Sequence, residues 1–166
     1  MDPDVRGLLD EQAIKRVLAR YCRGIDRLDQ DLVRACYHPD ATEAHGTFTG
    51  GLDEYLTWVW KLLGRYQSTF HFIGNVLVEP LDDDRARCET YGIAHHRTAD
   101  GAAVGNLVTG FRYVDRFERR DGEWRIAHRT AVTEWTSVDA HRWPLPPTMP
   151  LGRRDKTDVV YDEWPA

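Results

Sequence analysis

The sequence has no apolar run approaching the roughly 20 residues that a membrane-spanning helix requires. Its first residues, Met1-Asp-Pro-Asp, form neither the basic nor the apolar part of a secretory signal. The cysteines, Cys22, Cys36 and Cys88, are an odd number without C-x-x-C spacing, which argues against a disulfide framework. We therefore expect a soluble, cytoplasmic protein with reduced thiols and no membrane partner.

A basic surface is missing, as are the common metal and phosphate motifs. The 22 Lys and Arg residues are outnumbered by 27 Asp and Glu, which gives a formal net charge of -5 and argues against a nucleic-acid partner. The seven histidines include no H-E-x-x-H motif, and Gly50-Gly51 is not followed by the Gly-Lys-Ser/Thr of a phosphate-binding loop. We expect no metal site and no cofactor.

Aromatic residues are abundant, with six Trp, seven Tyr and five Phe in a chain of 166 residues. Aromatic side chains bury large areas at low entropic cost, so they can fill the core of a single domain of this length. They can equally line a pocket for a flat or polycyclic ligand. For any single aromatic ring, the sequence allows either role, core packing or the lining of a pocket.

The first part of the chain has the period of helices. Apolar residues recur every three or four positions in residues 11–25, which predicts a helix with one buried face. A second, short helix is expected from a cap at Asp29 to a point before Pro39. A third is expected from a cap at Asp53 to Gly64, after a turn at residues 49–51.

From Gln67 the period of the apolar residues changes to two, which predicts strands. We expect four long strands, a short edge strand, and turns at residues 82–84, 100–101 and 121–122. Helices followed by hairpin-linked strands predict an α+β fold, in which a curved antiparallel sheet wraps around the helices as a cone with the cavity at its mouth. The long strands fall near residues 69–78, 86–97, 106–119 and 123–135, and the short strand near 42–48.

The chain after this domain, residues 136–166, has a different composition. The prolines Pro144, Pro146, Pro147 and Pro150 exclude regular helix or sheet, so the segment is either a disordered appendage or a strap across domain 1–135. Trp143, Tyr161 and Trp164 favour the strap. Because the helices can cover only one face of the sheet, we also expect a homodimer or homotrimer.

A carboxylate and an imidazole stand in apolar sequence about 45 residues apart. Tyr21-Cys-Arg-Gly-Ile-Asp26 ends the first helix, and Phe70-His71-Phe72-Ile73-Gly74 opens a strand. A neutral imidazole, with its ordinary pKa of about 6.5, suits a general base, and a carboxylate can orient the ring and stabilise the imidazolium. Alternatively, Asp26 caps a turn, and His71 is a core histidine whose ring nitrogens form structural hydrogen bonds.

His95 and His96 are the candidates for the acid that an elimination needs at its leaving group. Alternation along a strand sends them to opposite faces, so only one can face the cavity. His96 is favoured because its same-face neighbours, Ala94 and Gly92, are small and leave room for a ligand. Alternatively, both histidines are solvated strand residues.

Further side chains can contact a substrate. The hydrogen-bond donors Tyr21, Tyr113 and His45 can polarise a carbonyl group, which turns a neighbouring carbanion into an enolate. His128 and Arg129, on the last strand, are additional candidates. Arg129 can bind an acidic group of the substrate or pair with an acid of the chain.

The element order, the spacing Tyr21-x-x-x-x-Asp26, the strand Gln67–Gly74 and the hairpin Phe117–Ile126 resemble the SnoaL-like branch of the nuclear-transport-factor-2-like superfamily, over about residues 8–135. The strand of His71 is similar to scytalone dehydratase, the Tyr-Asp spacing to bile-acid 7α-dehydratase, and the Asp-His layout to hexachlorocyclohexane dehydrochlorinase. The resemblance implies a cystatin-like α+β barrel and a cofactor-free lyase, in which an Asp-paired His removes a proton and a β leaving group departs. Tyr113 and His45 differ from the dehydratase, which has Asn and Tyr there.

The sequence thus predicts a cofactor-independent lyase, specifically a dehydratase acting on a hydrophobic cyclic or aromatic hydroxy compound. An isomerase or a retro-aldol type C–C lyase would use the same base. A protein that binds a small molecule without catalysis is the alternative from a different class.

Overall fold

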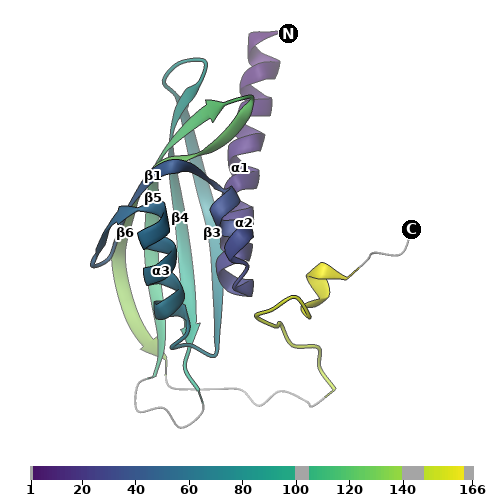
Figure 1. The fold of residues 1–166 in the computed structure, drawn as a ribbon, viewed down its shortest axis with the longest axis vertical. Helices are drawn as coiled ribbons and strands as arrows, with labels where there is room; N and C mark the ends of the chain where they lie inside the picture. The colour runs from purple at the N-terminus through teal and green to yellow at the C-terminus, as the bar shows by residue number, and fades with distance from the viewer. Residues whose placement is uncertain (1, 100–104, 140–147, 163–166) are drawn as a thin grey trace.

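The computed structural model describes residues 2–99, 105–139 and 148–162. Three helices and six strands follow one another in the order expected for an α+β fold, and a short 3-10 turn lies in the C-terminal segment (Figure 1). The expected turn at residues 100–101, and Trp143, Trp164 and Pro144–Pro147, lie outside the described residues. The elements are α1 (Pro3–Arg27), α2 (Gln30–Ala35), β1 (Tyr37–His45), β2 (Phe48–Gly51), α3 (Leu52–Leu63), β3 (Ser68–Pro80), β4 (Arg85–Arg97), β5 (Asn106–Arg120), β6 (Glu123–Asp139) and η1 (Val159–Tyr161).

The helix boundaries follow from local capping chemistry. The Asp2 carboxylate accepts a hydrogen bond from the Asp4 backbone N–H at 2.8 Å, and Pro3 occupies the first helical position, so α1 begins earlier than the periodicity alone predicted. Asp29 caps α2 as expected, accepting from the Leu32 N–H at 3.1 Å. Residues 49–51 do not form the expected turn, because they pair with β1 as strand β2, and α3 starts directly after them.

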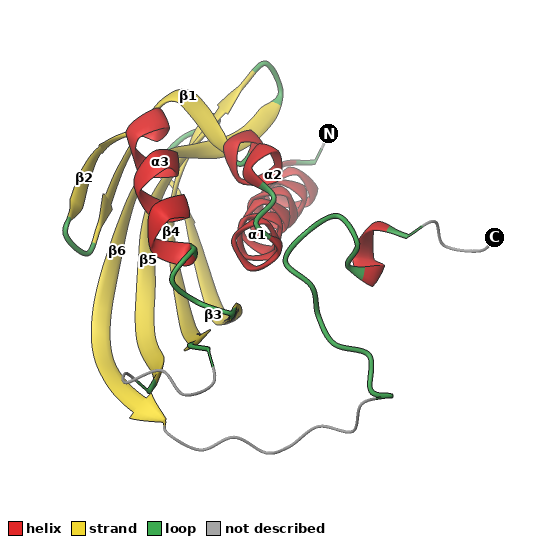
Figure 2. Cartoon of the chain, turned by 60° about the horizontal axis from the view of Figure 1, so that its bottom comes forward, coloured by secondary structure: helices red, strands yellow, loops and turns green. Residues whose placement is uncertain are grey.

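The sheet has the strand order β2-β1-β6-β5-β4-β3 and curves around the helices (Figure 2). Neighbouring strands are antiparallel except for β1 and β6, which run parallel, so the sheet is mixed rather than wholly antiparallel. The alternation of apolar residues shows which face of β1 is buried. It does not show whether β1 runs parallel or antiparallel to β6, because no hairpin connects the two strands. Register irregularities with extra residues in β1, β3 and β6 add to the curvature.

The concave face of the sheet and the helices enclose the core. Fully buried side chains come from α1, α3 and the inward positions of β4, β5 and β6, and each large apolar one contributes about 1.5–3 kcal/mol relative to an exposed position. The expected α+β architecture with helices on one face is confirmed. The largest apolar members are Tyr21, Tyr37, Tyr55, Phe117, Ile14, Leu18, Leu56, Leu63 and Ile126.

The opposite, convex face of the sheet presents large apolar side chains to solvent. Phe72 is 61% exposed, and it shares a shallow groove with Tyr91, Ile93 and Trp135. A contiguous apolar patch on a sheet face is typical of a protein contact surface. We therefore propose that this face joins identical subunits.

The subunit contact can be tested with a charge in the middle of the patch. Light scattering at micromolar concentration should give two or three times the chain mass of 19.2 kDa, and Phe72→Asp should shift the protein to the monomer because a buried unpaired carboxylate is costly. Thr57→Asp, on the exposed side of α3, is the control and should leave the mass unchanged. A monomeric wild-type protein would contradict the proposal.

Candidate active site

The last turn of α1 and the start of β3 bring Asp26 and His71 together. His71 Nδ1 lies 2.7 Å from Asp26 Oδ1, and the His71 backbone N–H donates to Asp26 Oδ2 at 2.9 Å. The Thr69 hydroxyl also donates to Oδ1, at 2.9 Å. Since an ionised carboxylate only accepts hydrogen bonds, Nδ1 carries the proton and Nε2 is the ring nitrogen left to act as a base.

The surroundings keep the Asp26 carboxylate ionised. Its side chain is 9% exposed and that of His71 is 8% exposed. Burial by itself opposes ionisation, but the hydrogen bonds and charge of His71, together with Thr69, outweigh it and hold the pKa of Asp26 below its ordinary value. The pair therefore combines a charged carboxylate with an imidazole that it orients.

His96 lies beside this pair on β4. Its ring centre is 5.6 Å from that of His71, in an edge-on arrangement, and 4.9 Å from that of Tyr66. Burial, reinforced by the neighbouring His71, lowers the pKa of His96 to about 4. Its ring is consequently neutral at physiological pH, which does not fit the expected role as a proton-donating imidazolium. Its buried Nδ1 has no hydrogen-bond partner within the described ranges.

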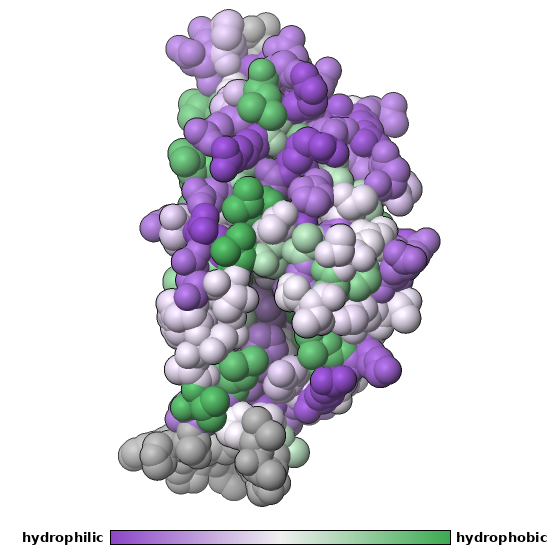
Figure 3. Space-filling view, turned by 90° about the vertical axis from the view of Figure 1, so that its left-hand side faces the viewer, coloured by the Kyte–Doolittle hydropathy of each residue, from purple (hydrophilic) through white to green (hydrophobic). Residues whose placement is uncertain are grey.

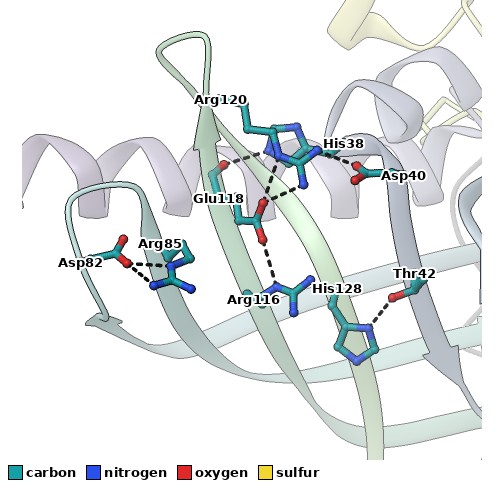
Figure 4. Close-up of polar contacts among 9 residues, drawn as sticks. All are labelled: His38, Asp40, Thr42, Asp82, Arg85, Arg116, Glu118, Arg120 and His128. Atoms are coloured by element: carbon teal, nitrogen blue, oxygen red, sulfur yellow. Dashed lines mark hydrogen bonds and ion pairs between the residues drawn. The ribbon is translucent and has the colours of Figure 1, made fainter.

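Two of the expected substrate contacts point away from this region. His95 is exposed on the convex face of β4, opposite His96. His128 is also on the convex face, where its Nδ1 lies 2.7 Å from the Thr42 hydroxyl, near the charged cluster around Arg120 (Figure 4). The structure therefore does not bring His95 or His128 to the Asp26–His71 pair, and of the two adjacent histidines it is the favoured His96 that lies on the concave face.

The small residue Gly92 also serves a different purpose from the one expected. A Cβ atom there would lie 2.4 Å from the Phe111 ring, so Gly92 makes room for a side chain of the protein rather than for a ligand. Phe111 in turn lies 6.1 Å from the His71 ring and 4.5 Å from the Tyr113 ring, measured between ring centres. These rings form an aromatic wall that begins at His71.

The remaining candidates lie deeper in the cone. Arg129 is fully buried and pairs with Asp115 through hydrogen bonds of 2.8 and 2.7 Å, so the acid that it binds belongs to the chain. Its guanidinium stacks 3.9 Å from the Tyr113 ring centre and 4.3 Å from that of Tyr21. The Tyr21 hydroxyl is taken up by Tyr55, 2.5 Å away. Tyr21 and Tyr113 are buried, which raises the pKa of both hydroxyls.

His45 keeps some contact with solvent. Its side chain is 28% exposed, and its Nδ1 lies 3.0 Å from Glu43 Oε1. It packs between Tyr55, Trp58 and Tyr113. Figure 3, seen from the side of α3 and β6, shows a hollow in the lower half of this face with hydrophilic atoms at its floor.

A crevice also opens between α1, β3 and the C-terminal segment, beside the Asp26–His71 pair. The C-terminal segment, residues 148–162, is held there by Lys156 and Tyr161, which bind Asp29 at 2.5 and 2.9 Å, and by Asp158, which pairs with Arg27. Arg154 donates to the Tyr66 carbonyl at 2.5 Å, and its charge contributes to lowering the pKa of His96. The side chains that line the crevice include Cys22, Asp26, His71, Ile73, Asp158 and Val160.

Sequence reasoning missed four of these residues: Thr69, Glu43, Tyr55 and Arg154. Thr69 and Glu43 each stand two positions before a candidate histidine, and this same-face spacing was the signal available for both. Tyr55 continues the buried stripe of α3 with Leu56 and Val59. Nothing in the proline-rich tail distinguishes Arg154.

Comparisons with known proteins show the family and the fold. The SnoaL-like domain model matches residues 6–130, so the chain belongs to the SnoaL-like domain family. The chain is 27% identical over 138 residues to terrestric acid biosynthesis cluster protein E of Penicillium crustosum, which covers 80% of this chain and 88% of that one.

Two solved structures have the same fold. One is a putative scytalone dehydratase from Novosphingobium aromaticivorans, with a TM-score of 0.75, 19% identity and coverage of 89% of this chain and 99% of that one. The other is a hexachlorocyclohexane dehydrochlorinase from Novosphingobium barchaimii, with a TM-score of 0.77, 19% identity and coverage of 87% and 99%. Both are named for eliminations.

Two further findings concern the described residues alone. They contain no grouping of His, Cys, Asp and Glu side chains suited to holding a metal ion. Within the same ranges, no helix has the length and apolar character needed to span a membrane.

The role of Thr69 predicts a pH-dependent stability difference. The pKa of folded Asp26 is lowered, so its ionised form stabilises the fold above the unfolded pKa of about 3.9, and this contribution is lost as the pH falls through the folded pKa. Thr69→Val removes one donor to the carboxylate and should lower the free energy of unfolding by roughly 1.5–3 kcal/mol at pH 7. Urea denaturation should show that the difference in the free energy of unfolding between Thr69→Val and the wild-type protein is smaller below pH 4 than at pH 7.

The exposed substitution Thr57→Val is the matched control and should stay within about 0.5 kcal/mol at each pH. A loss in Thr69→Val that is the same at both pH values would show that Thr69 does not act through the Asp26 charge.

The contacts of the C-terminal segment predict protection from hydrogen exchange. The amides of Arg153 and Val160 bind the Asp158 carboxylate, so they should exchange at least about ten-fold more slowly than unstructured amides. Asp158→Ala should remove the protection, whereas Asp155→Ala, which loses only contacts to Thr157, should preserve it. Complete exchange within seconds in the wild-type protein would identify the segment as an appendage.

Proposed function

We propose that the protein is a cofactor-independent lyase, specifically a dehydratase, in which His71 is the general base and Asp26 orients it. The observation that carries the proposal is the buried 2.7 Å contact between His71 Nδ1 and Asp26 Oδ1, next to the aromatic wall. Elimination needs a base aimed at a carbon-bound proton, and a neutral imidazole with a fixed tautomer provides one. The family and the names of its structural neighbours support the same reaction class.

In the proposed reaction, Nε2 of His71 removes a proton from a carbon adjacent to a carbonyl group of the substrate. The electrons of the broken C–H bond form the double bond, and the bond to the leaving oxygen breaks. Asp26 stabilises the imidazolium, because its charge is already held in place by Thr69 and the His71 backbone. His96, as a neutral ring, contributes a hydrogen bond near the reacting atoms.

The substrate class follows from the walls of the site. Phe111 lies beside His71, Tyr66 lies beside His96, and Tyr113 and Trp58 continue the apolar surface toward His45, whereas Arg129 is occupied by Asp115. Such walls favour a hydrophobic cyclic or aromatic compound, with a hydroxyl β to a carbonyl as the leaving group.

The base can be tested with β-(para-nitrophenoxy)propiophenone, which eliminates para-nitrophenoxide when a base removes its α-proton. Release of the yellow phenoxide gives kcat/KM directly. His71→Ala and Asp26→Asn should each lower kcat/KM by about 10²–10⁴, because a positioned base contributes this much and the amide favours the wrong tautomer. Hexachlorocyclohexane serves as a second probe, since a structural neighbour is named for its dehydrochlorination.

His95→Ala, on the exposed convex face, is the control and should retain wild-type turnover. A His71→Ala variant with near-native turnover would refute the assignment of the base. Exchange of the α-proton with D2O, without release of phenoxide, would instead indicate an isomerase.

A further inference from the structure

The cone contains a second carboxylate–imidazole pair, which neither the family nor the proposed base accounts for. Glu43, 1% exposed, holds His45 through the 3.0 Å contact between Oε1 and Nδ1. Its other oxygen accepts a hydrogen bond from the Tyr37 hydroxyl at 2.9 Å. The pair repeats the arrangement of Asp26 and His71: a buried carboxylate with an additional donor fixes one ring nitrogen, and the other nitrogen stays available.

The two pairs stand on opposite walls of the same concave face. His71 is on β3, at one edge of the strand order, and His45 is on β1, near the other edge, and the curvature of the sheet turns these strands toward each other (Figure 2). A path of aromatic rings joins them, with ring-centre distances of 6.1 Å from His71 to Phe111, 4.5 Å on to Tyr113 and 6.3 Å on to His45. His45 is also among the groups whose electrostatic interaction lowers the pKa of His96.

A row of buried charged side chains lies next to His45. Glu43, Arg129 and Asp115 are register partners on β1, β6 and β5, and none is more than 2% exposed. By formal charge this row contains two carboxylates and one guanidinium, so it complements the positive charge of the imidazolium from which a histidine donates a proton. The rings that pack against His45 from the other elements are uncharged: Tyr55 and Trp58 from α3 and Tyr113 from β5. His96 on β4 interacts with His45 electrostatically.

The proposed reaction lacks a proton donor at this point. Hydroxide is a poor leaving group, so a dehydration needs an acid at the departing oxygen. His96 is neutral at physiological pH, and the hydroxyls of Tyr21 and Tyr113 are buried with raised pKa values. Among the residues that the structure describes, His45 is the remaining imidazole on the concave face.

We propose that His45 is the general acid of this site and that Glu43 is its positioning residue. The inference rests on the proposed function. As His71 takes the proton from carbon, the C–O bond breaks, and the departing oxygen keeps the bonding electron pair and receives the proton of His45. The products are the unsaturated compound and water. His71 then releases its proton to solvent and His45 regains one, so the protein returns to its starting state.

The test compares two probes that yield the same phenyl vinyl ketone but differ in their need for an acid. β-Hydroxypropiophenone must expel hydroxide, whereas β-(para-nitrophenoxy)propiophenone expels a stable phenoxide. His45→Gln and Glu43→Gln should lower kcat for the hydroxy probe by about 10²–10⁴ and change that for the nitrophenoxy probe by less than about five-fold. The product is measured by chromatography after trapping with excess thiol.

Controls separate this inference from the proposed base. His128→Gln, on the convex face of β6, should leave both rates unchanged. His45→Ala, with its melting temperature checked, should regain turnover of the hydroxy probe when imidazole is added, which tests the acid even if Gln disturbs the packing. Equal slowing of both probes by His45→Gln, or no effect on either, overturns the role of His45. A nitrophenoxy rate that is insensitive to His71→Ala overturns the proposed base instead.

Discussion

The rest of the site depends on the compensation of one buried charge, the Asp26 carboxylate. A carboxylate in the last turn of a helix meets the negative end of the helix dipole, and burial adds a desolvation cost. Three donors from β3, the Thr69 hydroxyl and the ring and backbone N–H groups of His71, offset both terms. The same contacts hold the end of α1 against the first residues of β3, so they both pack the two elements together and orient the His71 imidazole. Local propensity disfavours Asp at this position, which is why its presence there suggests a function.

Three buried carboxylates in the interior of the cone are each compensated by a partner. Asp26 pairs with His71, Glu43 with His45, and Asp115 with Arg129, while rings such as Tyr113 and Phe111 separate the pairs. Apolar surroundings strengthen each electrostatic contact and also raise the cost of leaving any partner alone. Removing one residue of a pair should consequently lower the free energy of unfolding by more than the loss of its hydrogen bonds alone. Substitution of a carboxylate by its amide keeps the shape of the side chain, so it tests the role in the reaction with less effect on folding than truncation to Ala.

The helices, the long strands and the relation of Asp26 to His71 could be predicted because they rest on periodicity, turn chemistry and a family pattern. What lay beyond prediction depends on contacts between distant segments. The parallel pairing of β1 with β6 has no hairpin to signal it, and the outward positions of His95 and His128 require knowledge of which face is concave. Glu43 was overlooked because a charged residue in a short edge strand normally faces solvent. The sequence could not show whether Arg129 binds an acidic group of the substrate or an acid of the chain, because its pairing with Asp115 depends on the register of β5 and β6.

Exposure distinguishes the three pairs in a way that bears on function. Arg129 and Asp115 have no side-chain exposure, so their ion pair serves the packing of the tyrosines around it. His45 keeps 28% side-chain exposure above a Glu43 side chain that keeps 1%, whereas His71 and Asp26 keep 8% and 9% and lie beside the crevice at the end of α1. A protein that only binds an apolar ligand gains nothing from two such imidazoles, since burying their carboxylates costs stability that apolar residues would not. Two imidazoles of fixed orientation on opposite walls would suit the proposed reaction, which removes a proton at one atom and delivers another nearby.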